Sequence, residues 1–446
     1  MQRIYEPAAY DTSQTAGAWW EETVASPLNF PTLNGDLTTD VAIVGAGYTG
    51  LNAALQLAEA HGVRAVVLDA AQPAWGASGR NGGFACIGGA KLPVSAQIKR
   101  FGLEETQKFH ASQLAAIQTV RENLERYQID ADTHSEDGEL CLAHRASTFQ
   151  AMRDEVEFEA KLFDQKSELI PKGALAERGM NATGAHGALL SKAGFALNPL
   201  KYAQGLAHAA QNLGIPIYAN SPVTKITQNA SRLSLHHPRG VVNARKVIIA
   251  TNGYSSDDIP RELAGRFLPV ISSILVTRPI TPIEQRAQGW TSDLMSYDSR
   301  NLLHYFRLMP DGRFLFGQRG ARKADAAHTA ANKRQNRLDF ERMFPAWRGV
   351  ESTHYWSGLI CTTLNRHPYI GPLEGQSQIF AALGFHGNGV SLASYSGRKL
   401  ADLVAGAKPD LPAALRTPLW RFALPGLRRH YLRLAFAHYR LKDGLF

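Results

Sequence analysis

The chain contains the stretch Val41-Ala42-Ile43-Val44-Gly45-Ala46-Gly47-Tyr48-Thr49-Gly50, and this stretch decides the fold. Its four apolar residues predict a buried strand, and the apolar residues after Gly50 recur at helical spacing. A second apolar run, 65–68, ends at Asp69, 19 residues after Gly50. Strand, glycine-rich turn, helix and second strand together predict a βαβ unit.

Each glycine of this turn has a physical purpose. Gly45 permits the tight turn, Gly47 lets backbone amides approach a diphosphate, and Gly50 lets helix and strand pack closely. The amides and dipole at the helix start attract phosphates, and a carboxylate after the second strand can accept hydrogen bonds from ribose hydroxyls. The pattern therefore predicts a dinucleotide site formed by Gly45, Ala46, Gly47, Tyr48, Thr49, Gly50 and Asp69.

A second glycine-rich loop follows soon after Asp69. It reads Gly76-Ala77-Ser78-Gly79-Arg80-Asn81-Gly82-Gly83 and combines glycines with a hydroxyl, a guanidinium and an amide. Such a loop can wrap a diphosphate and present donors to a second aromatic ring system. The alternative is a flexible surface loop, although Arg and Asn between glycines are costly choices for a mere linker.

Length and composition narrow the class of protein. The 446 residues are enough for two compact domains. The cysteines, Cys86, Cys141 and Cys361, are too far apart for a disulfide framework or a thiolate zinc site, so no metal site is predicted. We find no secretory signal and no apolar run of about 18 residues, so we expect a cytoplasmic protein. The net charge of +9 comes from dispersed residues, so we expect no nucleic-acid partner.

The rest of the chain alternates between helical and β-type patterns. Apolar residues at helical spacing predict a long helix between 103 and 127. The region 271–317 shows β-type alternation, which predicts a second domain dominated by strands. Near the end, a strand at 379–383 leads into another glycine-rich turn and a helix at 392–403. The predicted fold class combines α/β and α+β parts.

A family pattern is completed by three further stretches. They are the loop 76–83, the run Val247-Ile248-Ile249-Ala250-Thr251-Asn252-Gly253-Tyr254 and the late stretch Gly384-Phe385-His386-Gly387-Asn388-Gly389-Val390. Together with the first turn, they resemble the FAD-dependent D-amino acid oxidase superfamily, in particular its gamma-glutamylputrescine oxidase-like branch. The resemblance implies a Rossmann-like FAD domain and a second domain built on an antiparallel sheet. The implied division is an arm at 1–37, an FAD domain at 38–126, 194–264 and 354–408, a cap domain at 127–193 and 265–353, and a basic amphipathic segment at 409–446.

The resemblance also implies cofactor-binding residues beyond the first turn. Residues of the second loop would line the diphosphate and flavin, Val223 would meet adenine, and Thr251 and Gly253 would close over the dinucleotide. A helix start near the end of the chain would lie near the flavin pyrimidine, where it stabilises negative charge. The implied residues are Ser78, Gly79, Arg80, Asn81, Gly82, Val223, Thr251, Gly253, Gly358, Gly387, Asn388, Gly389 and Val390.

Two departures from the family pattern affect its chemistry. Amino-acid oxidases of the superfamily carry an Arg for the substrate carboxylate two residues after the glycine that Gly358 matches, where this chain has Ile360. The change favours an amine whose carboxylate is remote or absent. Cys361 lies about three positions from the cysteine that holds flavin covalently in some relatives, so we expect non-covalent FAD and a buried, apolar role for this thiol.

The reaction implied is hydride transfer from the carbon next to an amine to flavin N5, which gives an imine that water hydrolyses. The implied substrate is gamma-glutamylputrescine or a related polyamine derivative, with O₂ or a quinone as electron acceptor. On a predicted strand of the cap, His304, Tyr305 and Arg307 are the candidates for the substrate side of the flavin. The alternatives are a dehydrogenase of secondary amino acids such as pipecolate, proline or an opine, and an RNA-modifying flavoprotein.

The C-terminal segment 427–442 is amphipathic and basic. A helix of this kind can lie on an anionic membrane. We expect it instead to dock on the protein's own surface, and keep peripheral membrane contact as the alternative.

Overall fold

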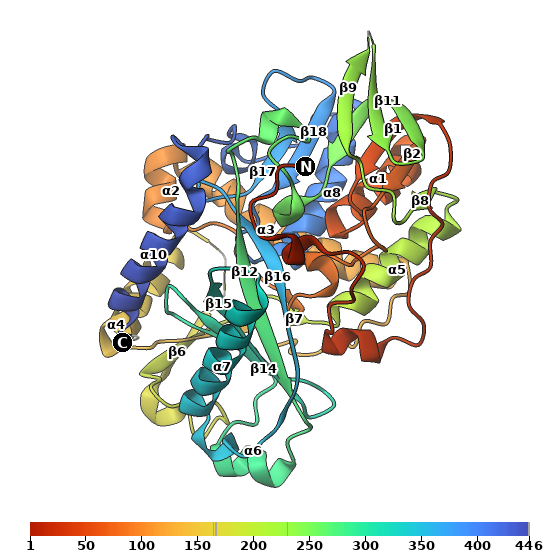
Figure 1. The fold of residues 1–446 in the computed structure, drawn as a ribbon. Coiled ribbons are helices and arrows are strands. Elements are labelled where there is room, and N and C mark those ends of the chain that lie inside the picture. Colours follow the sequence, from red (N-terminus) through yellow and green to blue (C-terminus); the bar gives the residue numbers. More distant parts are fainter. Residues whose placement is uncertain (164, 166, 230, 445–446) are drawn as a thin grey trace.

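The computed structural model describes residues 1–163, 165, 167–229 and 231–444. Within them, two large sheets form separate layers that meet along a central junction. In Figure 1 the first sheet lies at the upper right and the second extends to the lower left. No helix of the described residues combines the length and the apolar character needed to cross a membrane.

The first sheet is built around the predicted βαβ unit, which is confirmed. Its central strands run parallel, and Ile43 of β1 lies between Ile248 of β11 and Val67 of β2. β17 joins the edge antiparallel to β18, and β10 and β9 extend from β11. The order is β17 (Tyr369–Pro372), β18 (Ile379–Leu383), β11 (Gly240–Ile249), β1 (Leu37–Val44), β2 (Ala65–Leu68) and β8 (Ile217–Tyr218), with β10 (Arg232–His237) and β9 (Lys225–Asn229) beside β11.

Helices cover this sheet and share its apolar core. α1 packs closely against α8, and a Cβ on Gly397 would lie 2.3 Å from the carbonyl oxygen of Thr49. The predicted long helix is α3, and the late helix is α8, so both predictions are confirmed. The elements are α1 (Tyr48–His61), α2 (Val94–Phe101), α3 (Leu103–Arg126), α5 (Pro199–Asn212), α8 (Gly389–Ala405) and α9 (Ala413–Arg416), with the small sheet of β3 (Phe84–Ala85) and β7 (Phe195–Ala196) alongside.

The second sheet confirms the predicted cap architecture with one difference. Its neighbours are antiparallel except β13 and β4, which pair in parallel. A parallel pair needs a long crossover connection, and here about 150 residues separate the two strands. The order is β16 (Ser352–Thr362), β12 (Leu268–Thr277), β15 (Phe314–Ala321), β14 (His304–Leu308), β13 (Met295–Asp298), β4 (Glu139–Leu142), β6 (Gly187–Ser191) and β5 (Ser167–Pro171).

One face of the second sheet packs on helices through an aromatic core. Trp290 lies edge-on to Phe306, Phe314 and Phe344, and Trp347 stacks on Phe344. The opposite face turns toward the first sheet. Helices α6 (Pro282–Gln288) and α7 (Ala326–Met343) belong to the aromatic side, whereas α4 (Ala146–Glu159) packs against Cys141 and Leu189 on the other face. The division of the chain into domains stays a proposal, and β16 pairs with β12 although the proposed third FAD segment begins at residue 354.

The two ends of the chain pack on this body. In the N-terminal arm, Trp20 is buried and its indole N–H donates to the carbonyl of Asn81 at 2.9 Å. At the other end, α10 (Arg428–Asp443) docks on the body as expected, and its docked face combines Phe436, 5% exposed, with charged residues at both ends of the helix. Arg428 is 4% exposed and pairs with Asp257, whereas Leu434 is 70% exposed. The ion pair at the start of α10, Phe436 in its middle and the hydrogen bonds of Asp443 at its end hold the same face against the body.

Candidate active site

A cavity of about 430 Å³ opens where the two sheets meet. Strand register decides which residues of the second sheet face it. Ser272 of β12 lies between Arg319 of β15 and Gly358 of β16, and all three line the cavity. Because side chains alternate along a strand, this row defines the cavity face of the sheet. The glycine turn of the first sheet forms the opposite wall.

The glycines of that turn are needed for two different reasons. Gly45 has a positive φ of 110°, which other residues rarely adopt, and a Cβ there would lie 2.8 Å from the carbonyl oxygen of Ala250. Gly47 and Gly50 need glycine for space alone. A Cβ on Gly50 would lie 1.8 Å from the carbonyl oxygen of Gly45, and one on Gly47 would lie 2.7 Å from Ser78 Oγ. Strand, turn and helix are thus closely packed.

Asp69 closes the turn from the end of β2. Its Oδ2 accepts a hydrogen bond from the N–H of Ala46 at 2.6 Å, and Oδ1 accepts one from Ala71 at 2.9 Å. Burial raises the pKa of this carboxyl to about 6, although both backbone donors favour the ionised form. The carboxylate lines the cavity with acceptor capacity left for a ligand hydroxyl.

The second loop is held in one shape by its own side chains. Asn81 donates from Nδ2 to the carbonyl of Ser78 at 2.9 Å and accepts at Oδ1 from the N–H of Gly83 at 2.7 Å. Ser78 Oγ accepts from the N–H of Tyr48 at 3.0 Å, which ties this loop to the start of α1. Arg80 stacks over Trp75 with its guanidinium carbon 4.0 Å from the ring centre. This ordered loop is not a flexible linker.

At the far end of the cavity, α8 begins with its N-terminus exposed to the lumen. Asn388 does not cap the helix. Its Nδ2 donates to the carbonyl of Ile87 at 3.0 Å, so it fixes the segment after β3 beside the helix start. Gly387 has a φ of 100°, and a Cβ there would lie 2.3 Å from Nη2 of Arg319. The first backbone amides of α8 therefore remain available to an acceptor in the cavity.

Most residues expected to bind the cofactor surround this one cavity. Ala46, Gly50, Gly79 and Gly253 do not line it, and they contribute through backbone packing around it. A Cβ on Gly253, for example, would lie 2.9 Å from the carbonyl oxygen of Leu359. The expected residues that line the cavity are Gly45, Gly47, Tyr48, Thr49, Asp69, Ser78, Arg80, Asn81, Gly82, Val223, Thr251, Gly358, Gly387, Asn388, Gly389 and Val390.

Of the three residues expected on the substrate side, Tyr305 alone lines the cavity. Its hydroxyl lies 2.9 Å from Ser272 Oγ, and its ring covers Gly317. Burial raises the pKa of Tyr305 to about 12, so the phenol keeps its proton at neutral pH. The hydroxyl can orient a ligand by hydrogen bonding, but it cannot act as a base at that pH.

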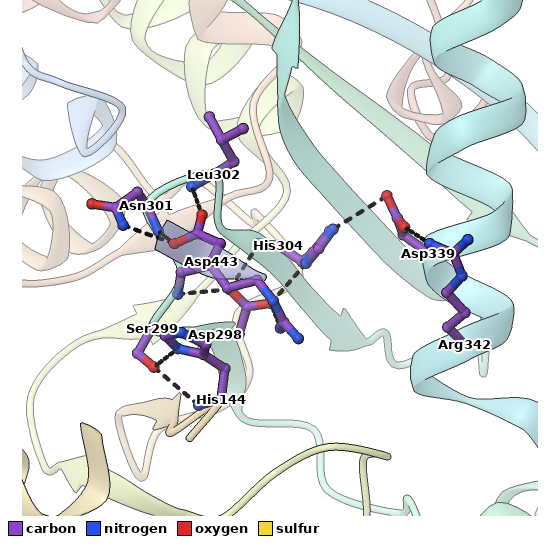
Figure 2. Close-up of polar contacts among 10 residues, drawn as sticks. His144, Asp298, Ser299, Asn301, Leu302, His304, Asp339, Arg342 and Asp443 are labelled. Carbon is purple, nitrogen blue, oxygen red and sulfur yellow. Dashed lines mark hydrogen bonds and ion pairs between the residues drawn. The ribbon is translucent and has the colours of Figure 1, made fainter. Parts of the chain in front are cut away.

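His304 and Arg307 do not line the cavity, contrary to the expectation that they contact substrate. Figure 2 shows His304 between Asp298 and Asp339. Its Nδ1 lies 2.7 Å from Asp298 and its Nε2 3.5 Å from Asp339. Burial opposes the charged ring, but the two carboxylates outweigh it and raise the pKa of His304 to about 9. The residue alternates onto the face of β14 opposite Tyr305.

Arg307 shares the face of Tyr305 but lies beneath the second loop. It donates from Nη2 to the carbonyl of Leu197 at 2.9 Å and from Nη1 to His134 Nε2 at 2.6 Å. A Cβ on Gly83 would lie 2.8 Å from Nη2. Arg307 therefore supports the loop from below, and burial lowers its pKa to about 9.

The cavity also contains ionisable side chains that the sequence did not single out. They are Lys91 from the segment after β3, Glu139 from β4 and Arg319 from β15. Burial lowers the pKa of Lys91 to about 7 and raises the pKa of Glu139 to about 7. No local motif marks these residues, since only the register of the second sheet and the path of the segment after β3 bring them to one place.

Comparison with known proteins identifies the family. Residues 40–403 match the family described as "DAO: FAD dependent oxidoreductase". The chain belongs to this family. It is 32% identical to gamma-glutamylputrescine oxidoreductase of Escherichia coli (strain K12) over 93% of this chain and 95% of that protein. It is 33% identical to the probable oxidoreductase OrdL of Haemophilus influenzae over 84% of this chain and 85% of that protein.

Solved structures show the same fold. Glycine oxidase from Geobacillus kaustophilus superposes with a TM-score of 0.71 at 21% identity, covering 87% of this chain and all of that one. L-proline dehydrogenase from P. horikoshii superposes with a TM-score of 0.67 at 18% identity, covering 84% and 96%. The expected family and fold class are confirmed. The protein is an FAD-dependent oxidoreductase of amines or amino acids.

The cavity fits FAD, the cofactor of the family. Space left free by Gly45 and Gly47 lies at the N-terminus of α1, where backbone amides favour a diphosphate. Arg80 lines the same cavity, and its buried Nη2 has no hydrogen-bond partner among the described residues. An anionic ligand would satisfy this donor. The roles of the individual residues in holding FAD are our proposal.

Proposed function

We propose that this oxidoreductase oxidises the C–N bond of an amine, and that gamma-glutamylputrescine or a related polyamine derivative is its substrate. The observation that carries the proposal is the similarity to the E. coli gamma-glutamylputrescine oxidoreductase, which extends over nearly the whole of both chains. Glycine oxidase, in contrast, shares the fold at 21% identity.

The cavity lining supports an amine rather than a simple amino acid. Ile360 lines the cavity at the position where the family resemblance places an Arg for a carboxylate next to the reacting carbon. An apolar side chain offers a carboxylate no hydrogen bond. We therefore propose that the reacting carbon of the substrate bears no carboxylate.

The side chains around the cavity position the substrate and exclude water. FAD, when bound, accepts a hydride from the carbon next to the amine nitrogen. Tyr305 and Ser272 form a hydrogen-bonded pair that can orient the substrate, and Ile274 and Leu303 add apolar surface. Removing water favours the neutral amine, which is the form that can give up a hydride. Alignment and desolvation are thus the tasks of the protein.

The experiment is an anaerobic titration of the purified yellow protein with a panel of amines. We expect gamma-glutamylputrescine to bleach the visible flavin absorbance rapidly, and putrescine, proline, pipecolate and sarcosine to act far more slowly. Rapid bleaching by proline or pipecolate, with none by gamma-glutamylputrescine, would establish the rival secondary amino-acid dehydrogenase. An RNA-modifying flavoprotein would instead show tRNA binding that strengthens steeply as salt is lowered.

The electron acceptor and a surface contact are part of the proposal. We propose O₂ or a quinone as acceptor, to be separated by measuring oxygen uptake against reduction of a soluble quinone.

The outer side of the C-terminal segment exposes Trp420, Leu424, Leu434 and Leu441, and Arg433 is exposed as well. We propose that this surface touches anionic lipid. Flotation with anionic liposomes at low salt tests it, and protein that stays at the bottom of the gradient would end the idea.

A further inference from the structure

Three charged side chains in the cavity have no role in the steps above. Arg319 and Glu139 come from β15 and β4 of the second sheet, and Lys91 comes from the segment between β3 and α2. Their burial in the cavity calls for a physical reason, because burying a charge is costly unless partners compensate for it.

Strand register places the two residues of the sheet on the same face. Ser272 lies opposite Arg319, and its hydroxyl meets Tyr305, so Arg319 shares the cavity face with that tyrosine. Tyr305 pairs with Tyr297, which lies beside Cys141 of β4. Glu139 precedes Cys141 by two residues and therefore points to the same side. The face that presents Tyr305 to the cavity thus also carries a guanidinium and a carboxylate.

Lys91 and Glu139 attract each other, but this attraction does not offset the cost of burying the two charges. Among the described residues, no oppositely charged side chain lies within 4.0 Å of Lys91, Glu139 or Arg319. Arg319 donates from Nη2 to the carbonyl of His386 at 3.1 Å, which leaves most of its donors free. Burial disfavours the charged form of each group. Arg319 further lowers the pKa of Lys91, and Glu139 raises it without cancelling the effect of burial. A ligand that brings charges of its own would relieve this cost.

We propose that Arg319 and Lys91 bind a carboxylate of the substrate and that Glu139 binds an ammonium group beside it, so that the enzyme selects amines carrying a zwitterionic amino-acid head. A guanidinium matches a carboxylate with two parallel hydrogen bonds, and an ammonium adds a compact charge. The inference rests on the proposed function, since a gamma-glutamyl group is such a head. The three residues would determine which substrate binds by holding its charged head, whereas the amine at the other end of the substrate would react at the flavin.

The first test compares substrates that share a reacting amine and differ in the head. Gamma-glutamylputrescine carries both charges, glutarylputrescine lacks the ammonium, and N-acetylputrescine lacks both. Arg319→Met should lower kcat/KM for the first two by about 10- to 100-fold, the range expected for a lost charged hydrogen bond, and leave the third within about twofold. Glu139→Gln should lower kcat/KM for gamma-glutamylputrescine alone. Lys172→Met, at an exposed cation outside the cavity, is the control.

Equal losses on all three substrates would overturn the inference, because the variants would then act on the flavin or the fold. Lys91→Met offers a second variant with the same expected pattern if Arg319→Met does not fold. The visible spectrum and the melting temperature of each variant report whether it is loaded and folded.

A binding measurement separates this inference from the proposed function. N5-propyl-L-glutamine carries the zwitterionic head and has no reacting amine, so its binding can be measured by calorimetry without turnover. We expect the wild-type protein to bind it at least tenfold more tightly than Arg319→Met does. If the wild type binds it in this way but does not oxidise gamma-glutamylputrescine, the proposed substrate is wrong and the head subsite stands. If the wild type does not bind it, or both proteins bind it equally, the subsite is wrong.

Discussion

Gly47 offers a sharp test of why the first turn needs glycine. Its dihedral angles, φ −91° and ψ −171°, are open to any residue, so an alanine would fit the backbone and only its methyl group would matter. That Cβ would lie 2.7 Å from Ser78 Oγ and 3.6 Å from Ser78 Cβ. The same Oγ accepts a hydrogen bond from the N–H of Tyr48 at 3.0 Å, so it cannot turn away without losing that bond.

The size of the effect follows from these distances. A contact of 2.7 Å is about 0.7 Å shorter than the 3.4 Å at which ordinary contact begins. Overpacking of this kind costs about 1–3 kcal/mol, and we expect Gly47→Ala to lower the stability of the apoprotein by that amount. Ser78→Ala removes the oxygen and leaves the 3.6 Å contact. The double variant should therefore recover the stability of Ser78→Ala.

FAD affinity should behave differently from stability. The added methyl group also occupies the space through which backbone amides approach the diphosphate, and removing Ser78 Oγ does not restore that space. We expect both Gly47→Ala and the double variant to bind FAD about 10-fold or more weakly than their Gly47 parents. Melting of the apoprotein and quenching of flavin fluorescence measure the two effects. A double variant that binds FAD as tightly as Ser78→Ala would refute the reasoning.

Three further predictions use the same structure. Gly50→Ala should abolish soluble, yellow protein because its Cβ would overlap a backbone oxygen at 1.8 Å, whereas Gly173→Ala, with no atom within 4 Å, should melt like the wild type. The pairing of His304 with Asp298 and Asp339 should contribute roughly 3 kcal/mol to the free energy of unfolding, since the two carboxylates together outweigh burial and raise the pKa of His304 from 6.5 to about 9. That stability is complete below pH 6.5 and is lost as pH rises through 9. The melting temperature of the wild type should therefore fall more between pH 7 and 10 than that of His304→Gln. If the two melting temperatures fall in parallel with pH, His304 does not have this role. Acid precipitation should leave the flavin in the supernatant, because burial raises the pKa of Cys361 to about 12 and its nucleophilic thiolate is scarce; a yellow pellet would indicate a covalent bond.

The sequence predicted the fold and the site best where all the residues involved lie within one short segment. The glycine turn, Asp69 and the second loop could be predicted because each lies within a few residues of the strand or helix that positions it. The same holds for the start of α8. For these elements, local spacing predicted both the secondary structure and the residues that line the cavity.

The substrate side could not be predicted in the same way. His304, Tyr305 and Arg307 lie on one strand, yet alternation turns His304 away, and the second loop covers Arg307. Asp298 precedes His304 by only six residues, but the second partner of His304, Asp339, comes from α7, which local sequence does not connect. Glu139 reaches the cavity through the parallel pairing of β13 and β4, which no local pattern indicates. Residues brought together by sheet register need a structure to be found.

The close packing of α1 on α8 has a consequence for how the protein is made. α1 is complete by residue 61, but the helix that covers it begins at residue 389, and β18 joins β11 only after residue 379. On the ribosome, the apolar side of α1 therefore waits for most of the polypeptide to be translated. A nascent chain in this state needs protection by chaperones, and premature termination before α8 would yield an aggregating fragment rather than a smaller working enzyme.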